Sequence, residues 1–127
     1  MRTEGNHLLL EYRGCDVGIL DDLDRIQRLM AQAALASNAR IVDLIFRPFR
    51  PQGVSGVVVI EESHLSIHTW PEAGYAAVDL FTCGTECVPE AAHKVLAEGL
   101  KASEYSMLKV RRGMLEAPYL ELVPPDD

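Results

Sequence analysis

The sequence has little of what several protein classes require. Its 127 residues include only three cysteines, at positions 15, 83 and 87, too few for a disulfide framework. The longest apolar runs, such as 57–60, have the length of a strand and fall far short of the roughly 20 residues that span a membrane. The first six residues contain no apolar signal region, so we expect a cytosolic protein that does not associate with membranes.

Positive charge is also scarce. The chain has 12 Lys and Arg against 19 Asp and Glu, a net charge of −7. This balance disfavours nucleic acid as a partner, mildly favours cationic ligands, and helps to keep the protein soluble.

The spacing of histidine and cysteine does not suit a metal site. His64 and His68 fall on one predicted strand, where four residues separate them by about 13 Å, too far for one ion to bind both. Cys83 and Cys87 meet the same objection if Cys83 ends a strand. We therefore expect no metal site.

Apolar residues, by contrast, are plentiful at 48%, enough for the core of one domain over 1–127. Apolar, β-branched and alternating runs predict strands at 7–13, 41–49, 57–60, 64–70, 75–83, 106–111 and 119–123. A single helix is expected from an N-cap at Asp16 to about Asn38, because apolar residues recur every three or four positions between 19 and 33. A second helix is expected to open at 87–89, with Pro89 in its first turn.

The order of these elements predicts an α+β fold, in which an antiparallel sheet carries both helices on one face. Pro48, near the end of its strand, favours an edge position in that sheet. The other face of the sheet would need cover, and a second copy of the chain could supply it.

Chemically active residues concentrate between 60 and 72. Leu65, Ile67 and Thr69 alternate with Ser66, His68 and Trp70, which is typical of a half-buried strand. The break at 61–63 before it predicts a tight turn between paired strands.

Ser63 is the residue of that turn with the most chemical potential. A turn serine ordinarily hydrogen-bonds the local backbone. Its hydroxyl could instead attack the preceding carbonyl, and the resulting ester would eliminate once a base removed the Ser63 Cα proton. Chain scission would then leave a carbonyl at the new N-terminus, an electrophile that reacts with amines as a Schiff base. His68 is the natural base, and a partly exposed Cys83 could donate a proton, although each residue also has an ordinary structural interpretation.

Four segments together resemble the prokaryotic S-adenosylmethionine decarboxylase proenzyme family. They read FRPQGVSGVVVI at 49–60, ESH at 62–64, IHTWPE at 67–72 and YAAVDLFTCG at 75–84. The resemblance extends from residue 7 to about 101 and is weak after Ala102, where residues 111–114 and the Pro-rich end have no counterpart in the family pattern.

The resemblance implies that the chain cuts itself into 1–62 and 63–127. Ser63 would become a covalent pyruvoyl cofactor, and Glu62 would become the new C-terminus of the upstream fragment. His68 would be the processing base, and Ser55 would assist by holding the ester or its oxyanion.

The resemblance also implies a substrate and an assembly. Cys83 would reprotonate the substrate α-carbon after CO₂ leaves, Glu72 would bind the ribose hydroxyls, and Phe49 would stack on adenine. The family fold is an α/β sandwich that forms a homodimer, and its product donates aminopropyl groups in spermidine synthesis.

Two alternatives remain at this stage. A relative with the same pyruvoyl chemistry could decarboxylate ornithine or arginine, although Phe49 and Glu72 favour a substrate that carries a nucleoside. A non-enzymatic binding module with Ser63 uncut would not need Ser55, His68 and Cys83 together.

Overall fold

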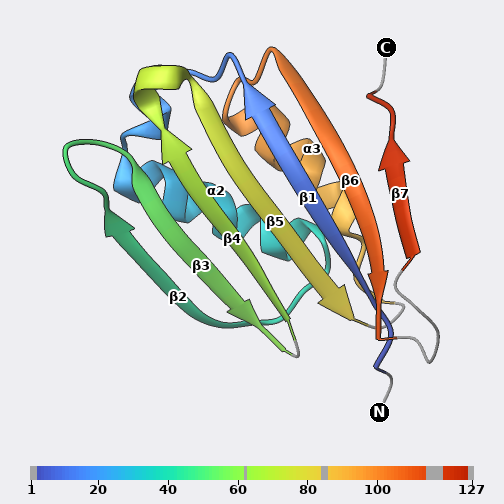
Figure 1. Ribbon diagram of the computed structural model, residues 1–127. Coiled ribbons are helices and arrows are strands. Elements are labelled where there is room, and N and C mark those ends of the chain that lie inside the picture. The colour runs from blue at the N-terminus through green and yellow to red at the C-terminus, as the bar shows by residue number, and fades with distance from the viewer. Residues whose placement is uncertain (1–2, 62, 84–85, 114–118, 126–127) are drawn as a thin grey trace.

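The computed structural model describes residues 3–61, 63–83, 86–113 and 119–125, which form one antiparallel sheet with helices packed on one side (Figure 1). The strands are β1 (Gly5–Arg13), β2 (Ile41–Pro48), β3 (Val54–Ile60), β4 (Ser63–Trp70), β5 (Tyr75–Cys83), β6 (Glu104–Arg112) and β7 (Tyr119–Val123). They pair in the order β2-β3-β4-β5-β1-β6-β7. The helices are α1 (Val17–Leu20), α2 (Leu23–Ala36), α3 (Pro89–Gly99) and the short 3₁₀ helix η1 (Pro71–Ala73). The predicted α+β architecture is confirmed, and β2 lies at an edge of the sheet, as Pro48 indicated.

The single helix expected between Asp16 and Asn38 is wrong in one respect, because the structure divides it into α1 and α2. Asp16 caps α1 as predicted, accepting a hydrogen bond from the Ile19 amide at 3.0 Å. Asp22 begins a new helix by accepting from the Arg25 amide at 3.1 Å, while Asp21 accepts from the Gly53 amide at 2.8 Å. Consecutive aspartates are good N-caps and poor interior residues, so they interrupt the helix and tie it to the β2–β3 loop.

The alternation predicted for β4 is confirmed. Leu65, Ile67 and Thr69 are buried against the helices, whereas His68 and Trp70 are exposed. Ser63 differs from the expectation, because it begins β4 rather than belonging to the turn. It pairs with Ile60 in the β3–β4 ladder, so the turn between the two strands is shorter than predicted.

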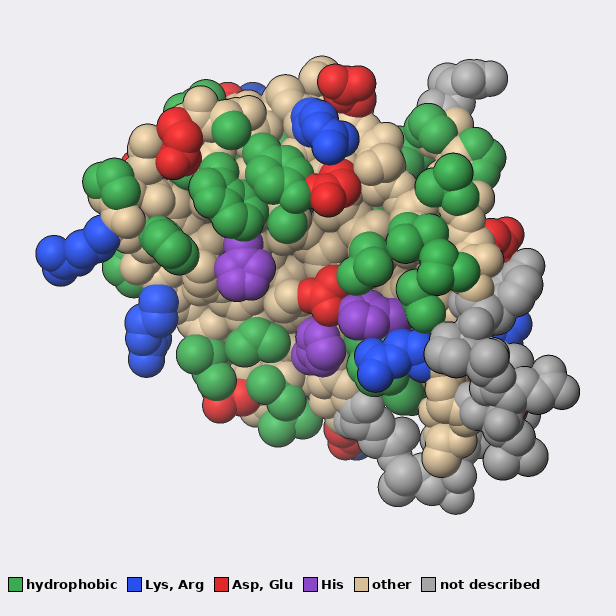
Figure 2. Space-filling view, viewed as in Figure 1, with side chains coloured by type: hydrophobic (Ala, Val, Ile, Leu, Met, Phe, Trp, Pro, Cys, Tyr) green, Lys and Arg blue, Asp and Glu red, His purple; other side chains and the backbone are tan. Residues whose placement is uncertain are grey.

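The side of the sheet away from the helices, called here the open face, carries both apolar and ionisable side chains. Residues that pair directly across an antiparallel ladder point to the same side, so Leu9, Asp79 and Leu122 all lie on this face through β1, β5, β6 and β7. Leu9 is 40% exposed and Leu122 is 75% exposed. Figure 2 shows this face, where hydrophobic patches surround histidines and carboxylates. Among the described residues, no helix is long and apolar enough to cross a membrane.

Candidate active site

Ser63 and Cys83 meet where β4 begins and β5 ends. The Ser63 hydroxyl donates a hydrogen bond to Cys83 Sγ at 3.3 Å, and both residues are half-buried. The hairpin between β3 and β4 places Ser63, and the adjacent strand β5 carries Cys83 to its level. Glu62, the expected upstream side of the cleaved bond, lies outside the described residues. The structure therefore brings the predicted nucleophile and the predicted proton donor together.

Ser55 and His68 form a second pair, at the other end of β4. They are directly opposed in the β3–β4 register, and Ser55 Oγ lies 3.1 Å from His68 Nδ1. Because these side chains come from adjacent strands and face the same way, the β-ladder itself sets their contact.

Phe49 and Glu72 lie at the same end of the sheet as Ser55 and His68. Phe49 follows β2 and is 55% exposed, and Glu72 is an exposed residue of η1. Gly53 holds the two segments together. It has a φ of +104°, and a Cβ there would lie 2.5 Å from the Thr69 carbonyl oxygen, so only glycine permits this approach. An exposed aromatic ring and an exposed carboxylate thus lie at the end of the sheet where His68 lies.

The structure does not bring the two pairs together within one chain. Ser63 and His68 are five residues apart on one continuous strand, a separation of about 16 Å at the usual rise of a strand. We call Ser63 and Cys83 the nucleophile half-site, and Ser55 and His68 the base half-site.

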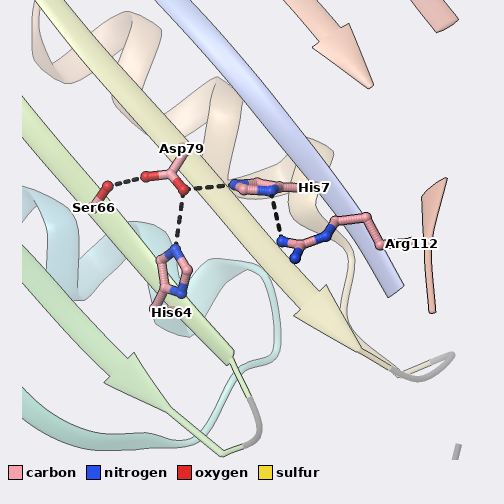
Figure 3. A network of polar contacts seen from close by, with 5 residues as sticks. All are labelled: His7, His64, Ser66, Asp79 and Arg112. Carbon is pink, nitrogen blue, oxygen red and sulfur yellow. Dashed lines mark hydrogen bonds and ion pairs between the residues drawn. The ribbon is translucent and has the colours of Figure 1, made fainter. Parts of the chain in front are cut away.

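A cluster that the sequence reasoning missed lies between β1, β4 and β5 (Figure 3). The Asp79 Oδ2 atom is 2.6 Å from His7 Nε2 and 3.0 Å from His64 Nε2, and Ser66 donates a hydrogen bond to Asp79 Oδ1. Arg112 Nη1 lies 3.2 Å from His7 Nδ1. The available signal was Asp79 itself, a charged residue in the middle of an otherwise apolar strand.

Among the residues that the structure describes, this cluster has the spacing of metal ligands. One ligand atom from each of His7, His64 and Asp79 lies within 4.8 Å of the others. The pairs that the sequence suggested, His64 with His68 and Cys83 with Cys87, are close together in the chain, whereas His7 is 72 residues from Asp79. Whether the cluster suits a metal ion or a hydrogen-bonded network depends on where the imidazole hydrogens lie.

Several titratable groups have displaced pKa values. Burial alone raises the pKa of Asp79, but hydrogen bonds from His7 and His64 outweigh it and hold the pKa below the ordinary 3.8. Burial, followed by the hydrogen bond to Glu11, raises the pKa of Tyr75 to about 12. Burial raises the pKa of the Cys15 thiol to about 11, so this thiol stays protonated and unreactive at neutral pH.

Comparison of the sequence with known proteins points to one family. Residues 6–113 match the family model described as S-adenosylmethionine decarboxylase. The S-adenosylmethionine decarboxylase proenzyme of Caldanaerobacter subterraneus subsp. tengcongensis is 52% identical over 118 residues, which covers 93% of this chain and 95% of that protein. The proenzyme of Pelotomaculum thermopropionicum is 47% identical over 123 residues, covering 97% and 98%.

Solved structures agree with the sequence match. The adenosylmethionine decarboxylase of Aquifex aeolicus superposes with a TM-score of 0.82 at 31% identity, covering 91% of this chain and 96% of that one. A Trypanosoma brucei AdoMetDC monomer superposes with a TM-score of 0.62 at 15% identity, covering 83% of this chain and 45% of that longer one. The second likeness concerns the fold alone.

Proposed function

The chain belongs to the S-adenosylmethionine decarboxylase family, and we propose that it is a proenzyme that cuts itself before Ser63 and then decarboxylates S-adenosylmethionine. The observation that carries the proposal is the contact between Ser63 and Cys83 at 3.3 Å. It joins a nucleophile for self-cleavage to a proton donor for the decarboxylation step, where β4 begins and β5 ends.

Self-cleavage follows from the position of Ser63 at the start of β4. Its hydroxyl attacks the carbonyl carbon of residue 62, and the C–N bond breaks, so the peptide becomes an ester with a free amine on residue 63. A base then removes the Ser63 Cα proton, and the Cβ–O bond breaks to release the carboxylate of residue 62. The dehydroalanine that remains tautomerises to an imine, which takes up water and loses ammonia and so leaves a pyruvoyl group at residue 63.

Ser63 suits this conversion because its half-buried hydroxyl lies next to a thiol. A pyruvoyl group supplies an electron sink for the charge that remains when CO₂ leaves. Cys83 then gives a proton to the substrate α-carbon. This step requires the thiol to lie beside residue 63, as it does in the uncut chain.

The base half-site reaches Ser63 only if a second copy of the chain supplies it. His68 is the group suited to remove the Cα proton, yet on its own chain it lies about 16 Å from Ser63. A two-fold axis through the open face would place the partner subunit's base half-site over the nucleophile half-site, and the reverse. Exposed apolar residues on this face favour such a homodimer: Leu9, Ile45, Trp70, Leu120 and Leu122.

Substrate recognition falls to Phe49 and Glu72. The exposed Phe49 ring offers a surface on which adenine can stack, and Glu72 offers a carboxylate to the vicinal ribose hydroxyls. A bare amino acid such as ornithine or arginine has neither group, so these residues favour S-adenosylmethionine. We expect no nucleic-acid partner, because the net charge of −7 does not suit nucleic acid, and the cytosolic location stays a prediction.

Intact-mass spectrometry combined with a substrate assay tests the proposal. Purified protein should give two fragments that divide between residues 62 and 63, and Ser63→Ala should give one uncut chain without activity. The kcat/KM for S-adenosylmethionine should exceed those for ornithine and arginine. An uncut wild-type chain would contradict self-cleavage, and faster turnover of either amino acid would contradict the substrate assignment.

A further inference from the structure

The Asp79 cluster links three strands on the open face beside the nucleophile half-site. Asp79, in the middle of β5, receives His7 from β1 on one side and His64 from β4 on the other (Figure 3). The side chains of His7, His64 and Asp79 are 17%, 38% and 22% exposed, so water competes only partly for their contacts. Such half-buried, charge-assisted hydrogen bonds hold geometry better than exposed ones.

The hydrogens of the cluster can be assigned from Arg112. A guanidinium can only donate, so its contact at 3.2 Å makes His7 Nδ1 an acceptor. The hydrogen of a neutral His7 then lies on Nε2, which donates it to Asp79. Asp79 Oδ1 meanwhile accepts from the Ser66 hydroxyl, so each carboxylate oxygen has a donor.

This assignment favours a hydrogen-bonded network over a metal site. A metal ion would need the lone pair of His7 Nε2, but the Arg112 contact places a hydrogen there. A neighbouring guanidinium also repels a cation. The close approach of His7 and His64 to one carboxylate oxygen is therefore explained by donated hydrogen bonds.

His64 is the residue that directly follows Ser63, and β5 contacts this short segment twice. Cys83 binds the Ser63 hydroxyl, and Asp79 binds the His64 imidazole. In the β4–β5 register His64 is opposite Phe81, so the Asp79 carboxylate reaches diagonally toward the beginning of β4. The two contacts together fix the backbone on the downstream side of the bond to be cut.

We propose that Asp79 is a positioning residue for self-cleavage, which holds Ser63 in its attacking geometry through His64. The inference rests on the proposed function, because it needs a chain that cuts itself. Attack of a hydroxyl on the preceding carbonyl is sensitive to placement, since an error of about 1 Å can cost about a hundredfold in rate. Loss of the anchor should therefore slow cleavage without preventing folding.

The test follows cleavage of freshly synthesised chains in a cell-free translation reaction, with fragments resolved on a denaturing gel. Asp79→Asn should cleave about ten- to a hundredfold more slowly than wild type. His64→Leu, which fills the volume but cannot donate, should be similarly slow. His64→Gln, whose amide can donate in place of Nε2, should recover most of the wild-type rate. Glu11→Gln, which alters another hydrogen-bonded carboxylate of the open face, is the matched control and should cleave normally.

The outcomes separate this inference from a general structural role and from the proposed function. The double variant Asp79→Asn with His64→Leu should be no slower than either single variant, because both changes remove one contact. If Asp79→Asn cleaved at the wild-type rate, the inference would be overturned. Equal cleavage rates for His64→Leu and His64→Gln would also overturn it. The two His64 variants keep Asp79 in place, so their comparison decides the matter if Asp79→Asn fails to fold.

Slower wild-type cleavage in EDTA would assign the cluster to a metal ion and would also overturn the inference. A wild-type chain that never cuts would refute self-cleavage itself, and this inference with it.

Discussion

Subunit mixing tests the proposed homodimer, in which each site would take residues from two chains. Ser63→Ala removes the nucleophile half-site function, and His68→Ala removes the base half-site function. Each variant alone should release no CO₂. In a mixed dimer, however, the Ser63 of the His68→Ala chain would face the intact His68 of its partner, so one complete site would form.

The expected recovery can be calculated from two-fold symmetry. Equal amounts of the two chains, paired at random, give half mixed dimers, and each has one complete site of two. Coexpression should therefore restore about a quarter of the wild-type activity, with about a quarter of all chains cut. Purification through two different affinity tags, one on each variant, would isolate mixed dimers and raise the recovery to about half.

A matched pair provides the control. Ser63→Ala coexpressed with Cys83→Ala alters two residues of the same half-site, and no arrangement of these chains yields a complete site, so activity should stay absent. If purified mixed dimers of the Ser63 and His68 variants were also inactive, the two residues would have to meet within one chain. In that case β4 could not remain a continuous strand in the active protein.

The remaining predictions concern single substitutions. His68→Ala should stop at the ester on Ser63, which hydroxylamine would cleave; normal pyruvoyl formation would remove His68 from this role. Glu72→Gln should cost about 1.5–3 kcal/mol in kcat/KM for S-adenosylmethionine, roughly one to two powers of ten, and Phe49→Ala should also lower it. Both variants should still cut themselves, so a cleavage defect in either would contradict the separation of the two roles. Because the pKa of Asp79 is held below 3.8 in the folded state, its carboxylate stabilises the fold above that pH, and this contribution is lost as the pH falls through the folded pKa. The difference in urea stability between wild type and Asp79→Asn should thus shrink below about pH 3.8, and a difference constant down to pH 2 would contradict it.

The sequence predicted most of the elements because local patterns determine them. The alternation of Leu65, Ile67 and Thr69 identified β4 and its buried side, and Pro48 identified an edge strand. The break between α1 and α2 was missed because the apolar stripe continues through it. The hydrogen bond that Asp21 accepts from Gly53 spans 32 residues and cannot be read from local spacing.

The candidate site was predicted only in part for a similar reason. Ser63 and Cys83 could be paired through the family resemblance, but the distance between Ser63 and His68 depends on β4 being straight and continuous. The Asp79 cluster depends on β1 lying beside β5, a pairing between strands about 70 residues apart in sequence. Short-range periodicity contains no information on such a pairing, although the isolated charge at Asp79 marked one member.

The central position of β1 has a consequence for a chain that cuts itself. Cleavage before residue 63 would assign β1, β2 and β3 to one polypeptide and β4 to β7 to the other, although β1 lies between β5 and β6 in the sheet. The two fragments would therefore be interleaved in one sheet, and the upstream fragment could not dissociate as a detachable propeptide does. Unfolding of the cut protein becomes a dissociation, so its melting temperature should rise with protein concentration even where the dimer stays saturated. Self-cleavage before Ser63 would thus convert one folded chain into an obligate complex of two polypeptides.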